Sequence, residues 1–235
     1  MTVLAMDTSA KAASVCLAEE DKIIGEFYIN TGLTHSQTLA PMTEQLCKNA
    51  GVPLDKIGAV AVNAGPGSFT GVRIGVAAAK GLAFAHDLPC VAVSTLESMA
   101  YNMLGCDGIV CALMDARCGQ VYNALFRVTG STVERLCDDR ALALTELQAE
   151  LRDCTETIVL VGDGAAIGYK ALADLPCDVR LAPMNKVNQT AASVALAAFE
   201  RLKAGDVCTP AALMPIYLRL PQAQRELNKK MGVQP

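Results

Sequence analysis

One pattern occurs twice in the sequence, and this repeat constrains the fold more than any other feature. The apolar run Val3–Asp7 ends in a Met-Asp pair, and the run Ile109–Asp115 ends in the same pair. Each run leads into further strand-like segments, a helix, a strand and a glycine-rich loop. A repeat of this length predicts the duplication of one α/β unit and not a solenoid. We therefore expect two βββαβα halves, each a mixed sheet flanked by helices.

The expected boundary between the halves lies near residue 104, which gives an N-terminal half at 1–104 and a C-terminal half at 105–235. The tail of the second half could return to the first. Apolar periodicity predicts helices over His35–Ala50, Gly71–His86 and Thr190–Ala204. Pro41 suggests that the first of these becomes regular only near Leu39 or Ala40.

Composition and charge exclude several classes of protein. The chain has 235 residues, of which 52% are hydrophobic, so it can bury a substantial core. The longest apolar runs fall short of the roughly 18 to 20 residues that a membrane span needs, and the start lacks the pattern of a secretory signal. The net charge of −4 argues against a broad basic surface for nucleic acid. We expect a cytoplasmic protein without a membrane association.

The ten cysteines are scattered, without any Cys-x-x-Cys spacing. Several, such as Cys16, Cys90 and Cys111, fall inside apolar runs. This distribution favours small buried side chains in a reducing compartment over disulfides or a zinc site. We expect no bound metal.

The two repeated aspartates end the first strand of each half, where ligands of α/β sheets usually bind. Carboxylates, hydroxyls and backbone N–H groups could hold a magnesium-nucleotide there. The alternative is that each aspartate caps a turn. Ala116 and Arg117 stand where close approach to phosphate would favour glycine, which points to an inherited, inactive cleft. The candidate nucleotide-binding residues are Asp7, Thr8, Ser9, Asp115, Gly162 and Gly164.

The stretch Gly65–Gly75 is the most distinctive motif. It follows a strand and opens a helix, so its N–H groups could bind an anion, but it lacks the lysine of a phosphate-binding P-loop. Gly71, Gly75 and Ala79 recur every four residues and leave one helix face nearly bare. A bare face allows close approach by another helix, from the same chain or from another subunit. The sequence alone slightly favours an internal partner.

Two further segments contain polar residues but do not form a complete metal-binding or catalytic site. His35 has Leu39 four residues later, where a helical metal pair would need a second histidine. The basic tail 215–230 could contact RNA or a partner, although a solvated terminus is the default. No motif supports a Ser-His-Asp or Cys-His nucleophile, so a peptidase is the least favoured alternative.

Three motifs together, at Met6–Ser9, Thr34–Leu39 and Asn63–Gly75, resemble the bacterial TsaB (YeaZ-type) family, which serves in tRNA threonylcarbamoyladenosine synthesis. The resemblance covers nearly the whole chain. It implies the fold shared by actin, sugar kinases and heat-shock-chaperone ATPases. It also implies a TsaD-like catalytic partner, a TsaE-like ATPase, a homodimer when the chain is alone, and contact with tRNA only through the complex.

The resemblance implies that this chain is a non-catalytic scaffold or activator for threonylcarbamoyl transfer to the tRNA adenosine beside the anticodon. TsaD-like proteins carry a His-x-x-x-His metal motif, whose second ligand is replaced here by Leu39. No cofactor would be held firmly, with ATP or ADP as candidates within the complex. The alternative is a small nucleotide-dependent kinase or ATPase that uses Asp7 and Asp115.

The resemblance also implies a partner surface on the helices His35–Ala50 and Gly71–His86. We expect the small-residue stripe of the second helix to make the closest contact, although Leu39, Met42 and Leu46 could instead face the chain's own sheet. The expected interface residues are His35, Leu39, Met42, Leu46, Gly71, Arg73, Gly75, Ala79 and Lys80.

Overall fold

The computed structural model describes residues 1–219, and the part of the basic tail beyond residue 219 lies outside the described residues. The first half contains β1 (Thr2–Asp7), β2 (Ala13–Glu19), β3 (Lys22–Ile29), α1 (His35–Ala50), the 3-10 turn η1 (Leu54–Lys56), β4 (Ile57–Gly65), α2 (Phe69–Ala85), β5 (Cys90–Ser94) and α3 (Thr95–Tyr101). The second contains β6 (Gly108–Asp115), β7 (Gln120–Thr129), β8 (Thr132–Arg135), β9 (Arg140–Ala143), α4 (Leu144–Glu150), β10 (Ile158–Val161), α5 (Ala165–Ala171), β11 (Val179–Leu181) and α6 (Ala191–Lys203).

The two sheets have the same topology. The first has the strand order β3-β2-β1-β4-β5, and the second has the order β8-β7-β6-β10-β11, with β9 paired to β7. In each sheet the first three strands pair antiparallel and the last two join in parallel. This confirms the duplication of a mixed α/β unit. The βββαβα unit is extended in each half by one more strand and helix, and the short strand β9 was not expected.

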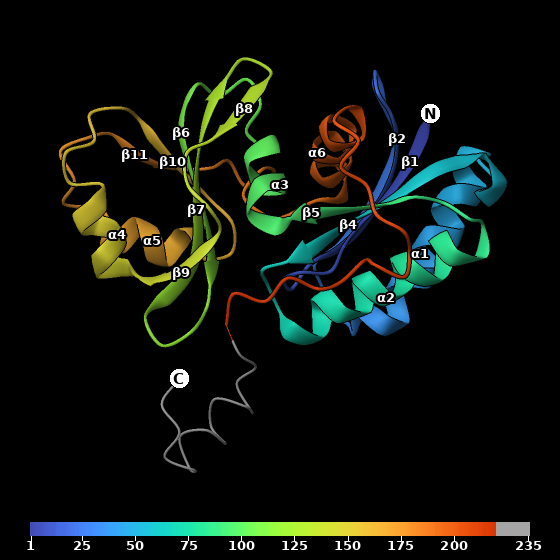
Figure 1. Ribbon diagram of the computed structural model, residues 1–235. Coiled ribbons are helices and arrows are strands. Elements are labelled where there is room, and N and C mark those ends of the chain that lie inside the picture. The colour runs from blue at the N-terminus through green and yellow to red at the C-terminus, as the bar shows by residue number, and fades with distance from the viewer. Residues whose placement is uncertain (220–235) are drawn as a thin grey trace, which may run out of the picture.

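Helices α3 and α6 lie between the two sheets, while α1 and α2 cover one outer face and α4 and α5 the other (Figure 1). The packing of the two central helices is crossed, in the sense that each helix packs on the sheet of the other half. Val194 and Phe199 of α6 pack on the first sheet, and Leu96 and Met99 of α3 pack on the second. Each half therefore supplies the helix that covers the inner face of the other half's sheet.

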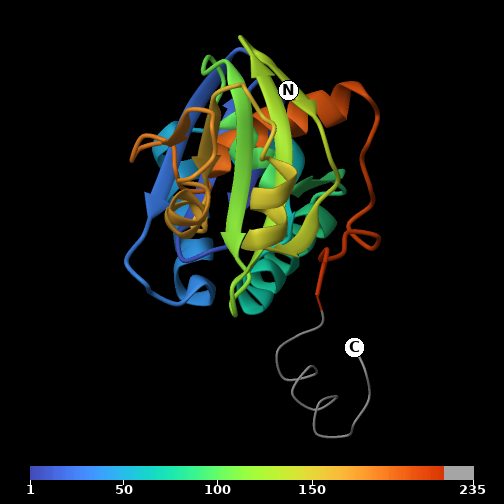
Figure 2. The ribbon, with the colours of Figure 1, turned by 90° about the vertical axis from the view of Figure 1, so that its left-hand side faces the viewer.

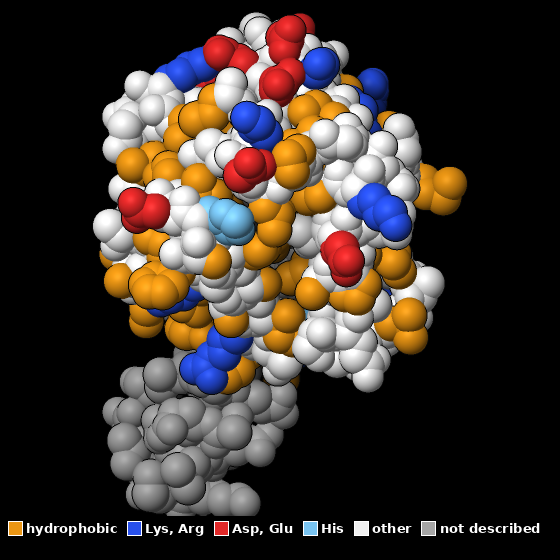
Figure 3. Space-filling view, turned by 90° about the vertical axis from the view of Figure 1, so that its right-hand side faces the viewer, with side chains coloured by type: hydrophobic (Ala, Val, Ile, Leu, Met, Phe, Trp, Pro, Cys, Tyr) orange, Lys and Arg blue, Asp and Glu red, His pale blue; other side chains and the backbone are white. Residues whose placement is uncertain are grey.

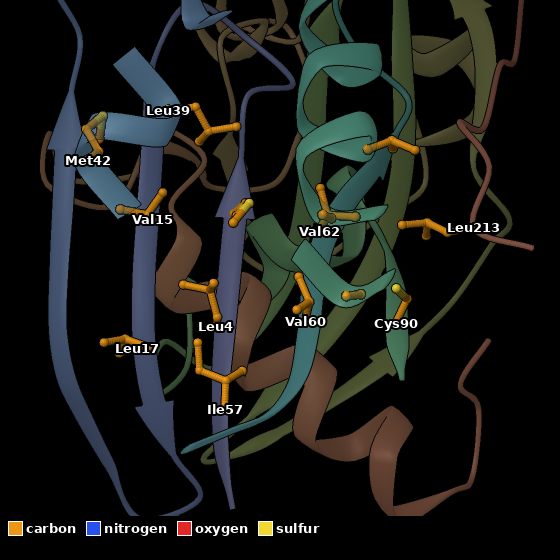
Figure 4. Packing of buried hydrophobic residues seen from close by; sticks show 14 of the residues in the cluster. Leu4, Val15, Leu17, Leu39, Met42, Ile57, Val60, Val62, Cys90 and Leu213 are labelled. Carbon is orange, nitrogen blue, oxygen red and sulfur yellow. The ribbon is translucent and has the colours of Figure 1, made fainter. Parts of the chain in front are cut away.

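Helix α1 lies on the outer face of the first sheet, where Leu39 and Met42 belong to the same core cluster as Val15 of β2 (Figure 4). The expectation that regular helix begins near Leu39 is wrong, because α1 already begins at His35 and holds Pro41 inside it. Pro41 removes only one backbone bond, and Gln37, whose carbonyl loses its partner, is exposed to water.

The chain after α6 returns to the first half and runs along its side (Figure 2). We call residues 208–219 the C-terminal strap. Its backbone pairs with β5 through two bonds between Cys208 and Cys90, at 2.8 and 2.9 Å. Leu213 is buried in the core near Val62 and Cys90 (Figure 4). None of the helices in residues 1–219 has the length and apolarity needed to cross a membrane.

Candidate functional site

A cleft of about 560 Å³ lies between the two halves, where β1 and β6 end. The turn after β1 and the N-terminus of α2 form its wall on the first half. The turn after β6 forms the wall on the second half, and residues 216–219 of the C-terminal strap complete the lining. Of the six predicted nucleotide-binding residues, the structure brings Ser9 and Asp115 together on the lining of this cleft.

Asp7 is fully buried beneath the cleft. Its Oδ1 accepts hydrogen bonds from the Ser9 backbone N–H at 3.0 Å and from Asn63 Nδ2 at 2.9 Å. Burial raises the pKa of the Asp7 carboxyl, although the bonds from Ser9 and Asn63 oppose this effect. The carboxyl therefore closes the turn after β1 and ties it to β4, as expected of a turn-capping aspartate.

The glycine-rich loop before α2 packs directly on this turn. The Ser68 N–H donates to the Ser9 carbonyl at 2.7 Å, and the Thr8 hydroxyl donates to the Gly71 carbonyl at 2.7 Å. A Cβ atom at Gly67 or Gly71 would overlap the backbone carbonyl oxygens of Ser9 and Thr8. These glycines thus serve close packing between two turns of the same chain, and Thr8 and Ser9 are buried by that contact.

The second half repeats the arrangement around Gly162 and Gly164. The Gly164 N–H donates to the Leu113 carbonyl at 3.0 Å, and a Cβ atom at Gly164 would lie 3.0 Å from the carbonyl carbon of Met114. Asp115 differs from Asp7 because it is exposed, and its Oδ1 accepts the Arg117 N–H at 2.8 Å. Asp115 is therefore free to meet a solute in the cleft.

Asp163 was not among the predicted site residues, although it lies between Gly162 and Gly164, which were both predicted to bind nucleotide. It lines the cleft with its side chain in contact with solvent, and desolvation by the cleft walls together with the nearby Asp115 carboxylate raises the pKa of Asp163 to about 6. Lys11, Arg117 and Arg219 line the same cleft. The cleft thus combines carboxylates with cations.

Three expected interface residues instead bind other parts of their own chain. His35 Nε2 lies 2.8 Å from the Ala10 carbonyl, which can only accept, so this nitrogen carries the proton. Arg73 Nε donates to the Tyr217 hydroxyl at 2.6 Å, and the Lys80 ammonium donates to the carbonyls of Ala211 and Leu213. His35 thus holds α1 against the turn after β1, and the two cations hold the C-terminal strap against α2.

The small-residue stripe expected to face a partner is buried inside the chain, so this prediction is wrong. Gly71, Gly75 and Ala79 face the turn after β1 and the first sheet. At Gly75 a Cβ atom would lie 2.5 Å from Thr8 Oγ1. The side chains of Leu39, Met42 and Leu46 also pack into the core below α1. The alternative prediction, that these side chains face the chain's own sheet, is therefore confirmed.

The exposed side of α2 carries a different small-residue stripe, and it borders a groove of about 790 Å³ between α1 and α2. Ala77, Ala78 and Gly81 line the groove from α2, while Glu44 and Lys48 line it from α1. Phe84, one turn further along α2, has 81% of its surface exposed. Figure 3 shows this side of the molecule, with hydrophobic side chains exposed between scattered charged ones.

Within residues 1–219 there is no group of three or more His, Cys, Asp and Glu side chains arranged to hold a metal ion. Cys16, Cys90 and Cys111 are fully buried in strands, as predicted. Burial raises the pKa of the Cys111 thiol to about 12, so this group stays protonated and packs as a small apolar side chain.

Comparison with known proteins identifies relatives of the whole chain. Residues 30–226 match the family model described as TsaD, tRNA N6-adenosine threonylcarbamoyltransferase. The tRNA threonylcarbamoyladenosine biosynthesis protein TsaB of Bacillus subtilis is 32% identical over 225 residues, which cover 95% of this chain and 96% of the relative.

Solved structures indicate the same family and the same fold. YeaZ from Pseudomonas aeruginosa superposes with a TM-score of 0.80 at 29% identity, and the match covers 92% of this chain and 99% of YeaZ. A ROK hexokinase from Thermus thermophilus, at 14% identity and a TM-score of 0.50 over 87% of this chain and all of the hexokinase, shares the fold alone. The fold is thus the actin and sugar-kinase type that the resemblance implied, and the chain belongs to the TsaB (YeaZ) family of tRNA threonylcarbamoyladenosine biosynthesis proteins.

Proposed function

We propose that this chain is a non-catalytic subunit that binds a TsaD-like catalytic subunit through the groove between α1 and α2. In that complex it would support threonylcarbamoyl transfer to the tRNA adenosine beside the anticodon. The observation that carries the proposal is the groove itself, because it is apolar, exposed and lined by small side chains on α2. Exposed apolar grooves of this size on a folded chain commonly serve as binding surfaces.

The groove suits a helix from a structurally similar partner. Ala77 and Gly81 are four residues apart on the exposed side of α2, so a partner helix can approach the α2 backbone closely. Phe84 offers a large apolar anchor beside this stripe, and Glu44 and Lys48 supply charges at the border. An apolar centre with charged residues at its edge is the usual anatomy of a protein interface.

The cleft supports the non-catalytic part of the proposal. Thr8 and Ser9 are buried against the glycine-rich loop, and His35 already donates its proton to the Ala10 carbonyl. We propose that a TsaE-like ATPase and the tRNA meet this chain only within the complex, where ATP or ADP would bind. When alone, the chain would form a homodimer through the same groove, since an exposed apolar face without its partner favours pairing with a second copy.

The test is light scattering of the chain mixed with the TsaD-like protein of the same organism. We expect a 1:1 complex, and we expect Gly81→Leu to abolish it by filling the place of a partner helix. The matched control is Gly130→Leu, at another glycine with open space around its Cβ position. Because Gly130 has a φ of 58°, circular dichroism must first show that this control is folded. Full partner affinity in Gly81→Leu would refute the groove assignment.

A nucleotide-dependent kinase or ATPase is the second candidate. Exposed Asp115, Asp163 and Lys11 on the cleft lining favour it, because these groups could meet a magnesium-nucleotide. Calorimetry with Mg-ATP decides the question. Micromolar binding that Asp115→Ala abolishes would support this candidate, whereas absence of binding to the isolated chain would support the scaffold.

A further inference from the structure

The C-terminal strap crosses from the first half of the molecule to the second at the mouth of the cleft. The Ile216 N–H donates to the Ala64 carbonyl of β4 at 2.6 Å. Three residues later, the Arg219 guanidinium donates to the Ala116 carbonyl at 2.8 Å, in the turn that follows β6. The strap thereby links the end of β4 in the first half to the turn after β6 in the second half.

The part of the strap before residue 214 is firmly anchored. Cys208 exchanges two backbone hydrogen bonds with Cys90, and Leu213 is 1% exposed inside the core of the first half. The Lys80 ammonium also binds the carbonyls of Ala211 and Leu213. Release of this part would expose buried apolar surface and break a strand pairing, so it is coupled to unfolding of the first half.

The part after Leu213 is held differently. Met214, Ile216 and Tyr217 are 62%, 40% and 42% exposed, so each of them loses less apolar contact on release than Leu213, which is 1% exposed. The Tyr217 ring packs on Phe69, with ring centroids 5.1 Å apart, and its hydroxyl accepts the bond from Arg73. These are surface contacts of the kind that open locally without global unfolding.

We propose that residues 216–219 are a latch that closes the cleft between the two halves and can be released while the rest of the strap stays in place. Closed, the latch forms one wall of the cleft and joins the halves through Ala64 and Ala116. Released, it uncovers the N-terminus of α2 at Phe69 and frees the second half from this link. The hinge is at Met214 and Pro215, between the buried Leu213 and the first latch residue.

The latch has a consequence for the two surfaces described above. Phe69 and Arg73 lie on α2, the same helix that borders the groove, and they hold Tyr217 of the latch. A molecule that moves α2 therefore changes the contacts that hold Tyr217 in place, and so changes access to the cleft. The existence of the latch itself does not depend on the proposed partner.

Hydrogen exchange on the isolated full-length chain tests the latch. We expect the Ile216 amide in the wild type to exchange through local opening, faster than the amides of Cys90 and Cys208. Arg219→Ala removes the link to Ala116, so the Ile216 amide should exchange about tenfold faster while the other two are unchanged. The matched control is Arg180→Ala, which removes an exposed arginine paired with Asp178 outside the latch.

A fluorescence measurement gives an independent readout, because the chain contains no tryptophan. Tyr217→Trp places the sole indole in the latch, against Phe69. We expect acrylamide to quench this emission more strongly once Arg219→Ala is added, and Arg180→Ala to leave quenching unchanged. The latch is refuted if the Ile216 amide exchanges together with Cys208 in every variant, or if Arg219→Ala changes neither exchange nor quenching.

Discussion

The hydroxyl of Thr8 donates a hydrogen bond to the backbone carbonyl of Gly71 across 2.7 Å, and so joins the turn after β1 to the first turn of α2. The two segments are 63 residues apart in sequence, and they approach so closely that glycine is required at position 71. This contact decides which side of α2 faces the sheet. It thereby also decides which small residues remain on the surface.

The first prediction follows from this contact. In Gly71→Ala the new methyl group would overlap the Thr8 carbonyl oxygen, so the turn or the helix must shift. We expect the free energy of unfolding to fall by about 1 to 3 kcal/mol, the range for overpacked buried sites. Gly81 is in the same helix with open space around its Cβ position, so Gly81→Ala should raise stability by about 0.5 to 1 kcal/mol. Urea unfolding of both variants measures the difference, and equal effects would contradict this packing.

The second prediction concerns Phe84, which is 81% exposed in the isolated chain. If α1 and α2 form the partner surface, Phe84→Ala should weaken binding of the TsaD-like subunit about tenfold or more, as loss of an aromatic anchor does. The melting temperature of the isolated chain should stay nearly constant, because little buried contact is lost. Leu181→Ala, at a side chain that is 45% exposed on β11, is the control that should bind normally.

The duplication and the placement of Asp7 and Asp115 at strand ends were predictable from sequence, because apolar runs and terminal aspartates are local patterns. Which side of α2 is exposed to solvent was not predictable from the sequence. Gly71, Gly75 and Ala79 have the same four-residue spacing as Arg73, Ala77 and Gly81. Only the distant contact with Thr8 selects the first set for burial.

The crossed packing of α3 and α6 was beyond sequence reasoning for a similar reason. Both helices are rich in small and apolar residues, and nothing in their sequences says which sheet each one covers. The latch residues Tyr217 and Arg219 carry no periodic pattern either. Their role becomes visible only once Phe69 and Ala116, from both halves, are seen beside them.

The third prediction concerns pH. The pKa of Asp163 is raised to about 6 in the folded chain, above the value of about 3.9 in an unfolded chain. A raised carboxyl pKa favours the folded state most below the unfolded value, and this contribution is lost as pH rises through about 6. Asp163→Asn keeps an uncharged acceptor at the site, so it should be more stable than the wild type at pH 7. The two should converge near pH 4, and a pH-independent difference between their unfolding midpoints would contradict the assignment.

The last prediction tests the contact between the halves at α3 and α6. Glu97 of α3 accepts a hydrogen bond from Arg201 of α6 at 2.5 Å, and it lies 3.6 Å from Arg135 of β8. The side chains of Glu97 and Arg201 are 18% and 27% exposed, so the pair is largely shielded from water.

Glu97→Ala should therefore leave Arg201 partly buried with one partner fewer and lower the free energy of unfolding by about 1 to 3 kcal/mol. Arg201 would retain its exposed pairing with Asp206, which limits the loss to this range. The matched control is Glu200→Ala, since Glu200 pairs with Lys203 at the surface and should change stability by at most about 0.5 kcal/mol. Guanidinium unfolding compares the two variants. An effect of Glu97→Ala no larger than that of Glu200→Ala would mean that apolar packing alone joins α3 to α6.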